Sequence, residues 1–152
     1  MLPKAIRLKE VGPRDGLQNE KALISTADKV SRVNQLSNTG LDYIEVTSFV
    51  HPKWIPQLAD AVDVLTQIER KSGVTYAALV PNMKGLERAL EANIDEVSVF
   101  MSASEGHNKS NINKSIDETF PILKEVVDGA LAAGKTVRGY ISTAIACPYD
   151  GY

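Results

Sequence analysis

Short apolar runs and amphipathic stretches alternate along this chain. A short strand is predicted over residues 6–11 from the apolar residues Ile6, Leu8 and Val11. Further strands are predicted over residues 43–47, a run rich in β-forming residues, and over 75–80, 97–101 and 136–144. Between them, apolar residues recur at helical spacing from residue 26 to Gly40, over 57–72, from Asn82 to Asn93 and from Ser115 to Gly134. The pattern is βα four times, followed by one more strand. Such strict alternation predicts a parallel sheet with right-handed crossover connections.

Capping and terminating residues mark the ends of the predicted helices. Ser115 and Glu118 have the spacing of a capping box, and Asp28 stands where a carboxylate favours the start of a helix. Glycine or asparagine follows each predicted helix, at Gly40, Gly73, Asn93 and Gly134, as expected for left-handed closing residues. These signals support the helix boundaries independently of the apolar pattern.

Two architectures share this alternation. One is an open doubly wound sheet, which five strands would complete; the other is a (β/α)8 barrel, of which the chain would supply about half. The 152 residues contain no linker or low-complexity stretch, so we expect one domain.

Polar residues collect on one set of loops. In either architecture, ligands bind at the carboxyl ends of parallel strands. The loops at that end hold most of the candidate chemistry: Arg14, Asp15, Gln18, Ser48, His51, Lys53, Asn82, Ser104, His107, Asn108, Asn111, Asn113 and Cys147. The loops at the other end are short turns. The asymmetry favours an active-site rim, with residues 102–113 predicted as a polar loop.

The loop at residues 11–20 carries the sharpest candidate pair. Arg14 and Asp15 stand between Gly12 and Gly16, in a loop too specialised for a mere surface ion pair. Because adjacent side chains usually diverge, we expect the two groups to meet a common ligand rather than each other. The aspartate is a hard oxygen ligand suited to Mg²⁺ or Mn²⁺. The arginine is suited to stabilise negative charge that develops on an oxygen.

Glu45 lies in the middle of a predicted strand, between Ile44 and Val46, and so points to the opposite face from both. A buried carboxylate needs a partner, because an unpaired charge in the interior is very costly. If the sheet curves into a barrel, Glu45 points inward and Arg14 is its natural partner. The alternative is a strand glutamate on a solvated face.

Composition removes several classes of function. A net charge of −2 gives no electrostatic case for nucleic acid or an anionic membrane, and no apolar run approaches the length that spans a bilayer. The single cysteine, Cys147, cannot form an internal disulfide, so we expect a cytoplasmic protein in which it is a small buried residue. Neither histidine has metal-site spacing, and the glycines form no nucleotide-binding motif.

Several segments together resemble the 3-hydroxy-3-methylglutaryl-CoA lyases. The similarity begins with GPRDGLQNEK at residues 12–21 and continues through IEVTSFV at 44–50 and PKWIPQ at 52–57. It extends through VPNMKG at 80–85, SASE at 102–105, NIN at 111–113, VRGY at 137–140 and CPYDG at 147–151. The shorter Arg-Asp-Gly-x-Gln core is shared with isopropylmalate and homocitrate synthases, but the colinear matches in every loop are specific to the lyases.

The resemblance implies a metal-dependent (β/α)8 barrel that cleaves 3-hydroxy-3-methylglutaryl-CoA to acetyl-CoA and acetoacetate, a reaction of leucine degradation. It implies that Asp15 binds Mg²⁺ or Mn²⁺, that Arg14 polarises the thioester carbonyl and stabilises the enolate, and that Glu45 lies beside Arg14. It places Lys21, Asn111 and Tyr140 at substrate-binding positions. It also implies a CoA-thioester substrate and a homo-oligomer, with neither nucleic acid nor membrane as partner.

The chain also departs from that family. Family members are about twice as long, and the remaining metal ligands and the catalytic cysteine belong to the half without a counterpart here; Cys147 matches a different family cysteine. Lys114 and Thr143 stand where the family often has cysteine. We therefore expect residues 1–152 to form the N-terminal half of a barrel, roughly (βα)4β, with little activity alone. The alternatives are a related carboligase or a non-catalytic, self-associating half-barrel.

Overall fold

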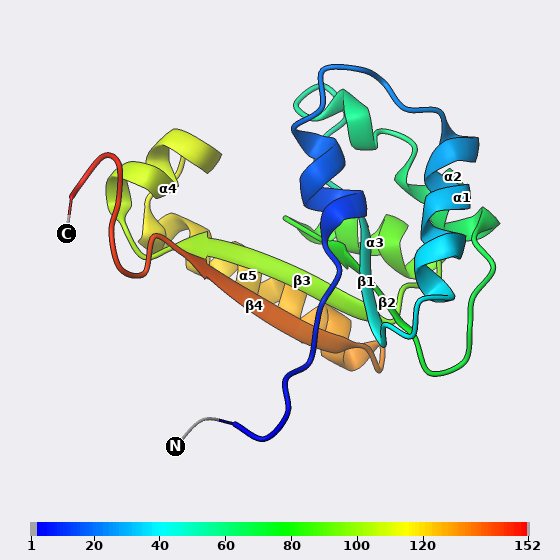
Figure 1. The fold of residues 1–152 in the computed structure, drawn as a ribbon. Coiled ribbons are helices and arrows are strands. Elements are labelled where there is room, and N and C mark those ends of the chain that lie inside the picture. Colours follow the sequence, from blue (N-terminus) through cyan, green and yellow to red (C-terminus); the bar gives the residue numbers. More distant parts are fainter. Residues whose placement is uncertain (1–2, 152) are drawn as a thin grey trace.

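The computed structural model describes residues 3–151, which fold around one parallel sheet. Its strands are β1 (Tyr43–Ser48), β2 (Thr75–Leu79), β3 (Glu96–Ser102) and β4 (Thr136–Ser142). They lie side by side in sequence order, β1-β2-β3-β4 (Figure 1). The helical segments are η1 (Gly12–Gly16), α1 (Thr26–Ser37), η2 (Pro56–Leu58), α2 (Ala61–Gln67), α3 (Met83–Glu91), α4 (Glu105–Ile112) and α5 (Ile116–Ala132).

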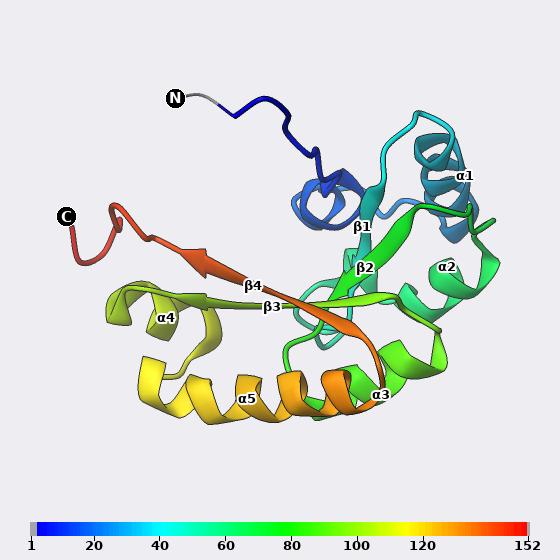
Figure 2. The ribbon, with the colours of Figure 1, turned by 90° about the horizontal axis from the view of Figure 1, so that it is seen from below.

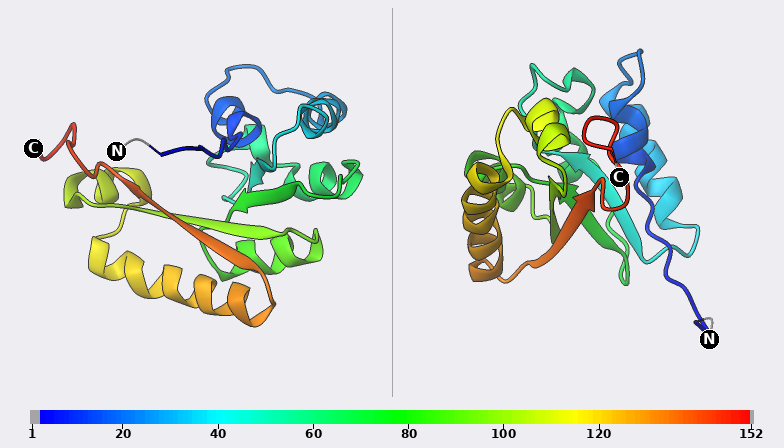
Figure 3. Two further views of the ribbon diagram at one scale, coloured as in Figure 1. Left: turned by 60° about the horizontal axis from the view of Figure 1, so that its bottom comes forward. Right: turned by 90° about the vertical axis from the view of Figure 1, so that its left-hand side faces the viewer.

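The strand order separates the two architectures that the sequence leaves open. A doubly wound sheet reverses its strand order and carries helices on both faces. Here every crossover moves one strand in the same direction, and α1, α2, α3 and α5 cover the same side of a strongly twisted sheet (Figure 2). Figure 3 shows α5 running beneath β3 and β4 on that side. This is the winding of a (β/α)8 barrel.

The two faces of the sheet differ in chemistry because side chains alternate along each strand. Ile44 and Val46 of β1 and Val97 and Val99 of β3 point toward the helices, where they join one apolar core. The residues between them point to the other face, which includes Glu45, buried with 0% of its surface exposed. The period-two pattern therefore places the apolar residues against the helices and the polar ones inside the curve of the sheet.

The predicted helix signals are confirmed. Ser25, Asn82 and Ser115 each accept a hydrogen bond from a backbone N–H in the first turn, and Ser115 and Glu118 form the complete capping box. Asn93 has a positive φ of 55°, the left-handed conformation expected at that helix end.

The predicted first strand, residues 6–11, is wrong. Only Glu10 pairs with the sheet, as a parallel bridge to Ile44, and Ile6 and Leu8 are largely exposed. A strand is held by hydrogen bonds from its neighbours, and β1 is the only strand beside this segment within residues 3–151. Its β-forming residues alone do not make it a strand.

Four further segments differ from the prediction. The polar segment 102–113 is not a loop throughout but contains α4, and the loop at 11–20 contains η1, a π-helical segment. The helix predicted over 57–72 begins as the short 3-10 turn η2 and continues as the seven-residue α2. The last strand ends at Ser142 rather than near Ala144. Among residues 3–151, no helix has the length and apolar character needed to cross a membrane.

Candidate functional site

A cavity of about 1230 Å³ opens at the carboxyl ends of the strands. Its walls come from η1, from the loops after β1 and β2, from α4 and from β4, with the lining residues Arg14, Asp15, Gln18, Val50, His51, Lys53, Trp54, Ile55, Leu79, Pro81, Asn82, Phe100, Asn111, Ile112, Tyr140, Ile141 and Ser142. The predicted position of the site thus coincides with this cavity.

The turn η1 delivers Arg14 and Asp15 to this cavity. The backbone N–H groups of both residues donate to the carbonyl oxygen of Val11, at 3.1 and 2.7 Å. The Glu10 carboxylate accepts a hydrogen bond from the Gly12 N–H at 2.6 Å, and a Cβ at position 12 would lie only 2.7 Å from that carboxylate. Any larger residue at position 12 would require the Glu10 carboxylate to move away from the start of the turn.

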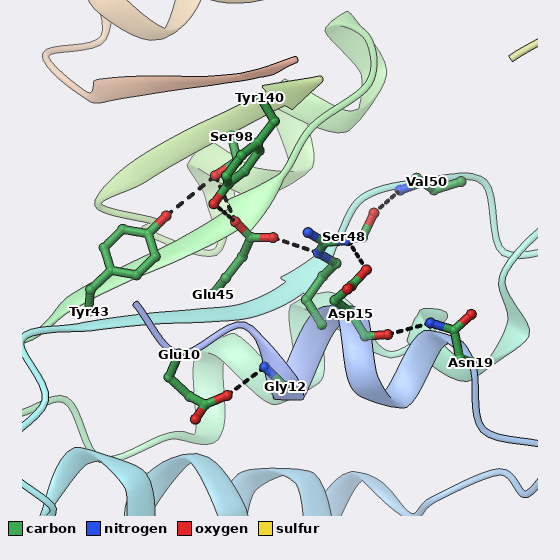
Figure 4. A network of polar contacts seen from close by, with 11 residues as sticks. Glu10, Gly12, Asp15, Asn19, Tyr43, Glu45, Ser48, Val50, Ser98 and Tyr140 are labelled. Atoms are coloured by element: carbon green, nitrogen blue, oxygen red, sulfur yellow. Dashed lines mark hydrogen bonds and ion pairs between the residues drawn. The ribbon is translucent and has the colours of Figure 1, made fainter. Parts of the chain in front are cut away.

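The carboxylate of Glu45 is the centre of a buried polar network (Figure 4). Its Oε1 accepts from Nε of Arg14 at 2.5 Å. Its Oε2 accepts from the Tyr140 hydroxyl at 2.9 Å and from the Ser98 hydroxyl at 3.0 Å. The Arg14 side chain is 14% exposed, so the ion pair is shielded from water. The inward orientation of Glu45 and its pairing with Arg14 are both as the sequence predicts.

The surroundings of this network keep two phenols in their neutral form. Burial, reinforced by the negative charge of Glu45, raises the pKa of Tyr140 far above its usual value. Burial also raises the pKa of Tyr43, whose hydroxyl lies 3.5 Å from that of Ser98. Both tyrosines therefore remain proton donors at any physiological pH.

The expectation that Arg14 and Asp15 diverge is wrong. Nη1 of Arg14 lies 2.6 Å from Oδ1 of Asp15, so one guanidinium joins the exposed Asp15 to the buried Glu45. The side chains meet because η1 turns both toward the cavity, and because the long arginine can fold back while its Nε stays on Glu45. Asp15 remains accessible to a ligand on its other side, with 54% of its side chain exposed.

The other predicted residues divide into two groups. Asn111 and Tyr140 line the cavity with Arg14 and Asp15, whereas Lys21 is exposed and is not among the lining residues. Ser98 was missed by sequence reasoning, although it alternates between Val97 and Val99 in the way that Glu45 alternates between Ile44 and Val46. The same alternation would have identified it.

The donor atoms present fit part of a metal site. Asp15 offers a hard carboxylate on the cavity wall, whereas both oxygens of Glu45 are already occupied by protein donors. Over residues 3–151 no group of three or more His, Cys, Asp and Glu side chains is arranged to hold a metal ion. Asp15 can therefore supply one coordination position, and the rest would come from substrate, water or other protein groups.

Cys147 lies apart from the cavity wall. It is buried, and its Sγ accepts hydrogen bonds from the backbone N–H groups of Tyr149 and Asp150, both at 3.3 Å. This agrees with its expected role as a small buried residue.

Comparisons with known proteins find relatives that match over nearly the whole chain. The chain is 62% identical over 148 residues to a hydroxymethylglutaryl-CoA lyase of Bacillus subtilis, covering 97% of this chain and 50% of the relative. It is 49% identical over 150 residues to the human mitochondrial hydroxymethylglutaryl-CoA lyase, covering 99% of this chain and 46% of that one. The chain therefore spans about half the length of the curated relatives it matches.

Solved structures give the same correspondence. The crystal structure of the Bacillus subtilis HMG-CoA lyase matches with a TM-score of 0.97 and 61% identity, over 99% of this chain and 50% of that one. An HMG-CoA lyase from Acinetobacter baumannii, in complex with coenzyme A and 3-methylmalate, matches with a TM-score of 0.92 and 38% identity, over 99% of this chain and 50% of that one. The four-stranded sheet and its helices thus match the N-terminal half of the TIM barrel in these lyases.

The family assignment follows from these matches and from the motifs that carry the site. The HMGL-like family matches residues 5–150, a range that contains every candidate site residue named above. This chain belongs to the HMGL-like family.

Proposed function

We propose that this chain carries the Arg14–Glu45 part of the active site of a hydroxymethylglutaryl-CoA lyase, which cleaves 3-hydroxy-3-methylglutaryl-CoA to acetyl-CoA and acetoacetate. The observation that supports this most directly is the shielded ion pair between Arg14 and Glu45 on the wall of a cavity at the carboxyl ends of the strands. The similarity to hydroxymethylglutaryl-CoA lyases over 97% of the chain selects this reaction among those that such a site could serve.

Each residue then has a chemical role. Breaking the carbon–carbon bond leaves negative charge on the thioester oxygen of the departing acetyl-CoA enolate. A guanidinium fixed by a buried carboxylate stabilises that charge without reorganising during the reaction. Glu45 holds Arg14 in place, and Asn111 and Tyr140, which also line the cavity, contact the substrate. Lys21, which is exposed and lies outside the cavity lining, would contact the CoA part of the substrate.

Asp15 is the proposed ligand of a divalent cation, Mg²⁺ or Mn²⁺, consistent with the metal dependence of this family. When bound, the metal supplies Lewis-acid polarisation of substrate oxygens. The exposed carboxylate of Asp15 is available for it, and the ion pair with Arg14 holds that carboxylate at the cavity wall. A net charge of −2 gives no electrostatic case for nucleic acid as a partner. The similarity to a lyase of Bacillus subtilis and to a lyase structure with bound coenzyme A supports a CoA-thioester substrate in a cytoplasmic setting.

A chimera tests the proposal. Residues 1–150 of this chain replace the matching half of the Bacillus subtilis lyase, which is 62% identical there. We expect the chimera to form acetoacetate at about 1 s⁻¹ or more, as ordinary enzymes do. In the chimera, Arg14→Met is expected to lower kcat by about 100-fold or more, because a fixed donor to the developing oxyanion is lost. Arg32→Met, on exposed helix surface, is the matched control.

Two outcomes would count against the proposal: a folded chimera without acetoacetate formation, and an Arg14→Met chimera as active as the Arg32→Met control. The 152-residue chain assayed by itself is expected to turn over well below about 1 s⁻¹. The reason is that Asp15 is the only carboxylate among the described residues that line the cavity, and these residues include no group of three or more side chains arranged to hold a metal ion.

A further inference from the structure

Ser98 is the third residue of β3 and has no exposed surface. It points away from the helices, since its neighbours Val97 and Val99 belong to the core on the helix side and Ser98 does not. Its hydroxyl lies 3.0 Å from Oε2 of Glu45, a residue 53 positions earlier in the chain. A fully buried hydroxyl whose partner is a buried carboxylate is not explained by strand formation, which uses backbone groups only.

The contact spans an intervening strand. Glu45 on β1 pairs with Ala77 on β2, whereas Ser98 on β3 pairs with Leu79, two residues further along β2. The glutamate side chain therefore reaches Ser98 diagonally, across the stretch of β2 from Ala77 to Leu79. Directly paired residues in a parallel sheet point to the same face, so Ala77 lies beneath that crossing. Its methyl group is small enough to leave the path open, and it is fully buried.

The hydrogen bonds have a definite direction. A serine hydroxyl has one proton, and here it is donated to the Glu45 carboxylate, which only accepts. The Ser98 oxygen is then free to accept from the Tyr43 hydroxyl 3.5 Å away, which is the donor of that pair. Burial raises the pKa of Tyr43, so this phenol keeps its proton. The chain of donors runs from Tyr43 through Ser98 to Oε2 of Glu45.

We propose that Ser98, supported by Tyr43, is a positioning residue: it fixes the Glu45 carboxylate and, through it, the guanidinium of Arg14. With Oε2 held by Ser98 and Tyr140, Oε1 is the oxygen that faces Nε of Arg14 at 2.5 Å. Without the Ser98 hydroxyl, Oε2 loses one of its two donors and the carboxylate can rotate, which releases the arginine. The catalytic consequence of this role rests on the proposed function, whereas the geometric link does not.

The first test is spectroscopic and needs no activity. The exchange rate of the Arg14 Nε proton with water is measured by NMR on the 152-residue chain, with Arg14→Lys identifying the signal. We expect Ser98→Ala to raise this rate about tenfold or more, the effect of losing a hydrogen bond to a charged group. Ser98→Thr keeps the hydroxyl and should stay within about threefold of the unmodified chain.

The matched control is Ser37→Ala. Ser37 is also a buried serine bonded to a tyrosine hydroxyl, at 2.9 Å from Tyr76, but it lies on α1 away from the cavity. It should change global stability without changing the Arg14 proton. The proposal is overturned if Ser98→Ala leaves the exchange rate unchanged, or if Ser37→Ala raises it equally. Should Ser98→Thr fail to fold by circular dichroism, the comparison of Ser98→Ala with Ser37→Ala decides.

The second test uses the lyase chimera described above. Ser98→Ala is expected to lower kcat about tenfold while leaving KM within about threefold, because it alters the position of Arg14 rather than substrate contacts. An unchanged kcat would contradict the positioning role. A chimera that is inactive even without substitution would refute the proposed function instead, and the NMR result would still decide whether Ser98 fixes Arg14 through Glu45.

Discussion

A carboxylate that accepts hydrogen bonds on both oxygens from protein donors is fixed in orientation, and it fixes the orientation of those donors in turn. Glu45 is such a group, because Arg14 occupies one oxygen and Tyr140 and Ser98 share the other. Burial of a lone carboxylate would be very costly, and these donors offset that cost. The consequence is that Arg14, whose other end contacts Asp15, has little freedom to turn.

At the same scale, Tyr43 and Tyr140 make the stability depend on pH under alkaline conditions. Burial raises the pKa of both phenols in the folded protein, and the charge of Glu45 adds to the effect. In the unfolded chain a tyrosine ionises near pH 10. Above that pH the unfolded state loses protons that the folded state keeps, so the free energy of unfolding falls as pH rises.

This pH dependence can be measured by urea unfolding across the alkaline range, with the absorbance of tyrosinate followed in parallel. We expect two tyrosines to ionise at a higher pH in the folded protein than in the unfolded chain. Tyr43→Phe and Tyr140→Phe should each remove one of these two high-pH ionisations from the titration. If neither substitution alters the alkaline titration, Tyr43 and Tyr140 are not the buried, neutral donors to Ser98 and Glu45 described above.

Alternation in the sequence predicted some of these residues and missed others. Glu45 was predicted because a carboxylate between two β-branched residues of a strand stands out in the sequence. Arg14 was predicted as its partner because a buried negative charge needs a positive charge beside it. Ser98 follows the same alternation, but a serine between valines does not by itself demand a partner. The contact between Arg14 and Asp15 depends on the backbone conformation of η1, which the residue types in this segment do not specify.

At the scale of elements, the caps are local and were predicted correctly. Ser115→Ala removes the N-cap of α5, where the side chains of Ser115 and Glu118 and their backbone N–H groups bond reciprocally. We expect it to lower the free energy of unfolding by about 1 kcal/mol. Urea unfolding measures this, with Ser31→Ala at an exposed position of α1 as a control that should change stability by less than about 0.5 kcal/mol. Equal effects from the two substitutions would mean that the cap contributes nothing.

Helix α4 shows why some elements escaped prediction. Its sequence, EGHNKSNI, has almost no apolar residue to mark a buried face. It is held instead by Ser104 at its N-terminus and by Asn108, which is buried and donates to the Lys114 carbonyl and the Thr119 hydroxyl. Those partners lie in the following segment, so the helix depends on tertiary contacts that a hydrophobic pattern does not reveal.

At the scale of the whole molecule, the sheet presents two edges. Within residues 3–151 no strand lies beyond β4, and Ile141 on that strand is 71% exposed. On the opposite side, Ile6 and Leu8 are exposed beside β1. Unpaired edges with apolar side chains are templates for pairing with another chain.

We therefore predict that the 152-residue chain self-associates. Sedimentation velocity should show a sedimentation coefficient that rises with concentration. Ile141→Lys places a charge on the β4 edge and should reduce the association. Leu131→Lys, an equivalent change at an exposed position on α5, should not. A compact monomer at all concentrations would contradict the prediction.

The sequence by itself determined the alternation of strands and helices, the helix caps, the burial of Glu45 and the family, because each is written in local spacing or in matched motifs. Only the tertiary structure decided that the strands lie in the order β1-β2-β3-β4, that residues 6–9 stay outside the sheet, and that Ser98 meets Glu45 across β2. Those outcomes depend on which segments become neighbours in space. Hydrophobic periodicity fixes the face on which a residue lies, but the partner it meets there is set by the register and curvature of the whole sheet.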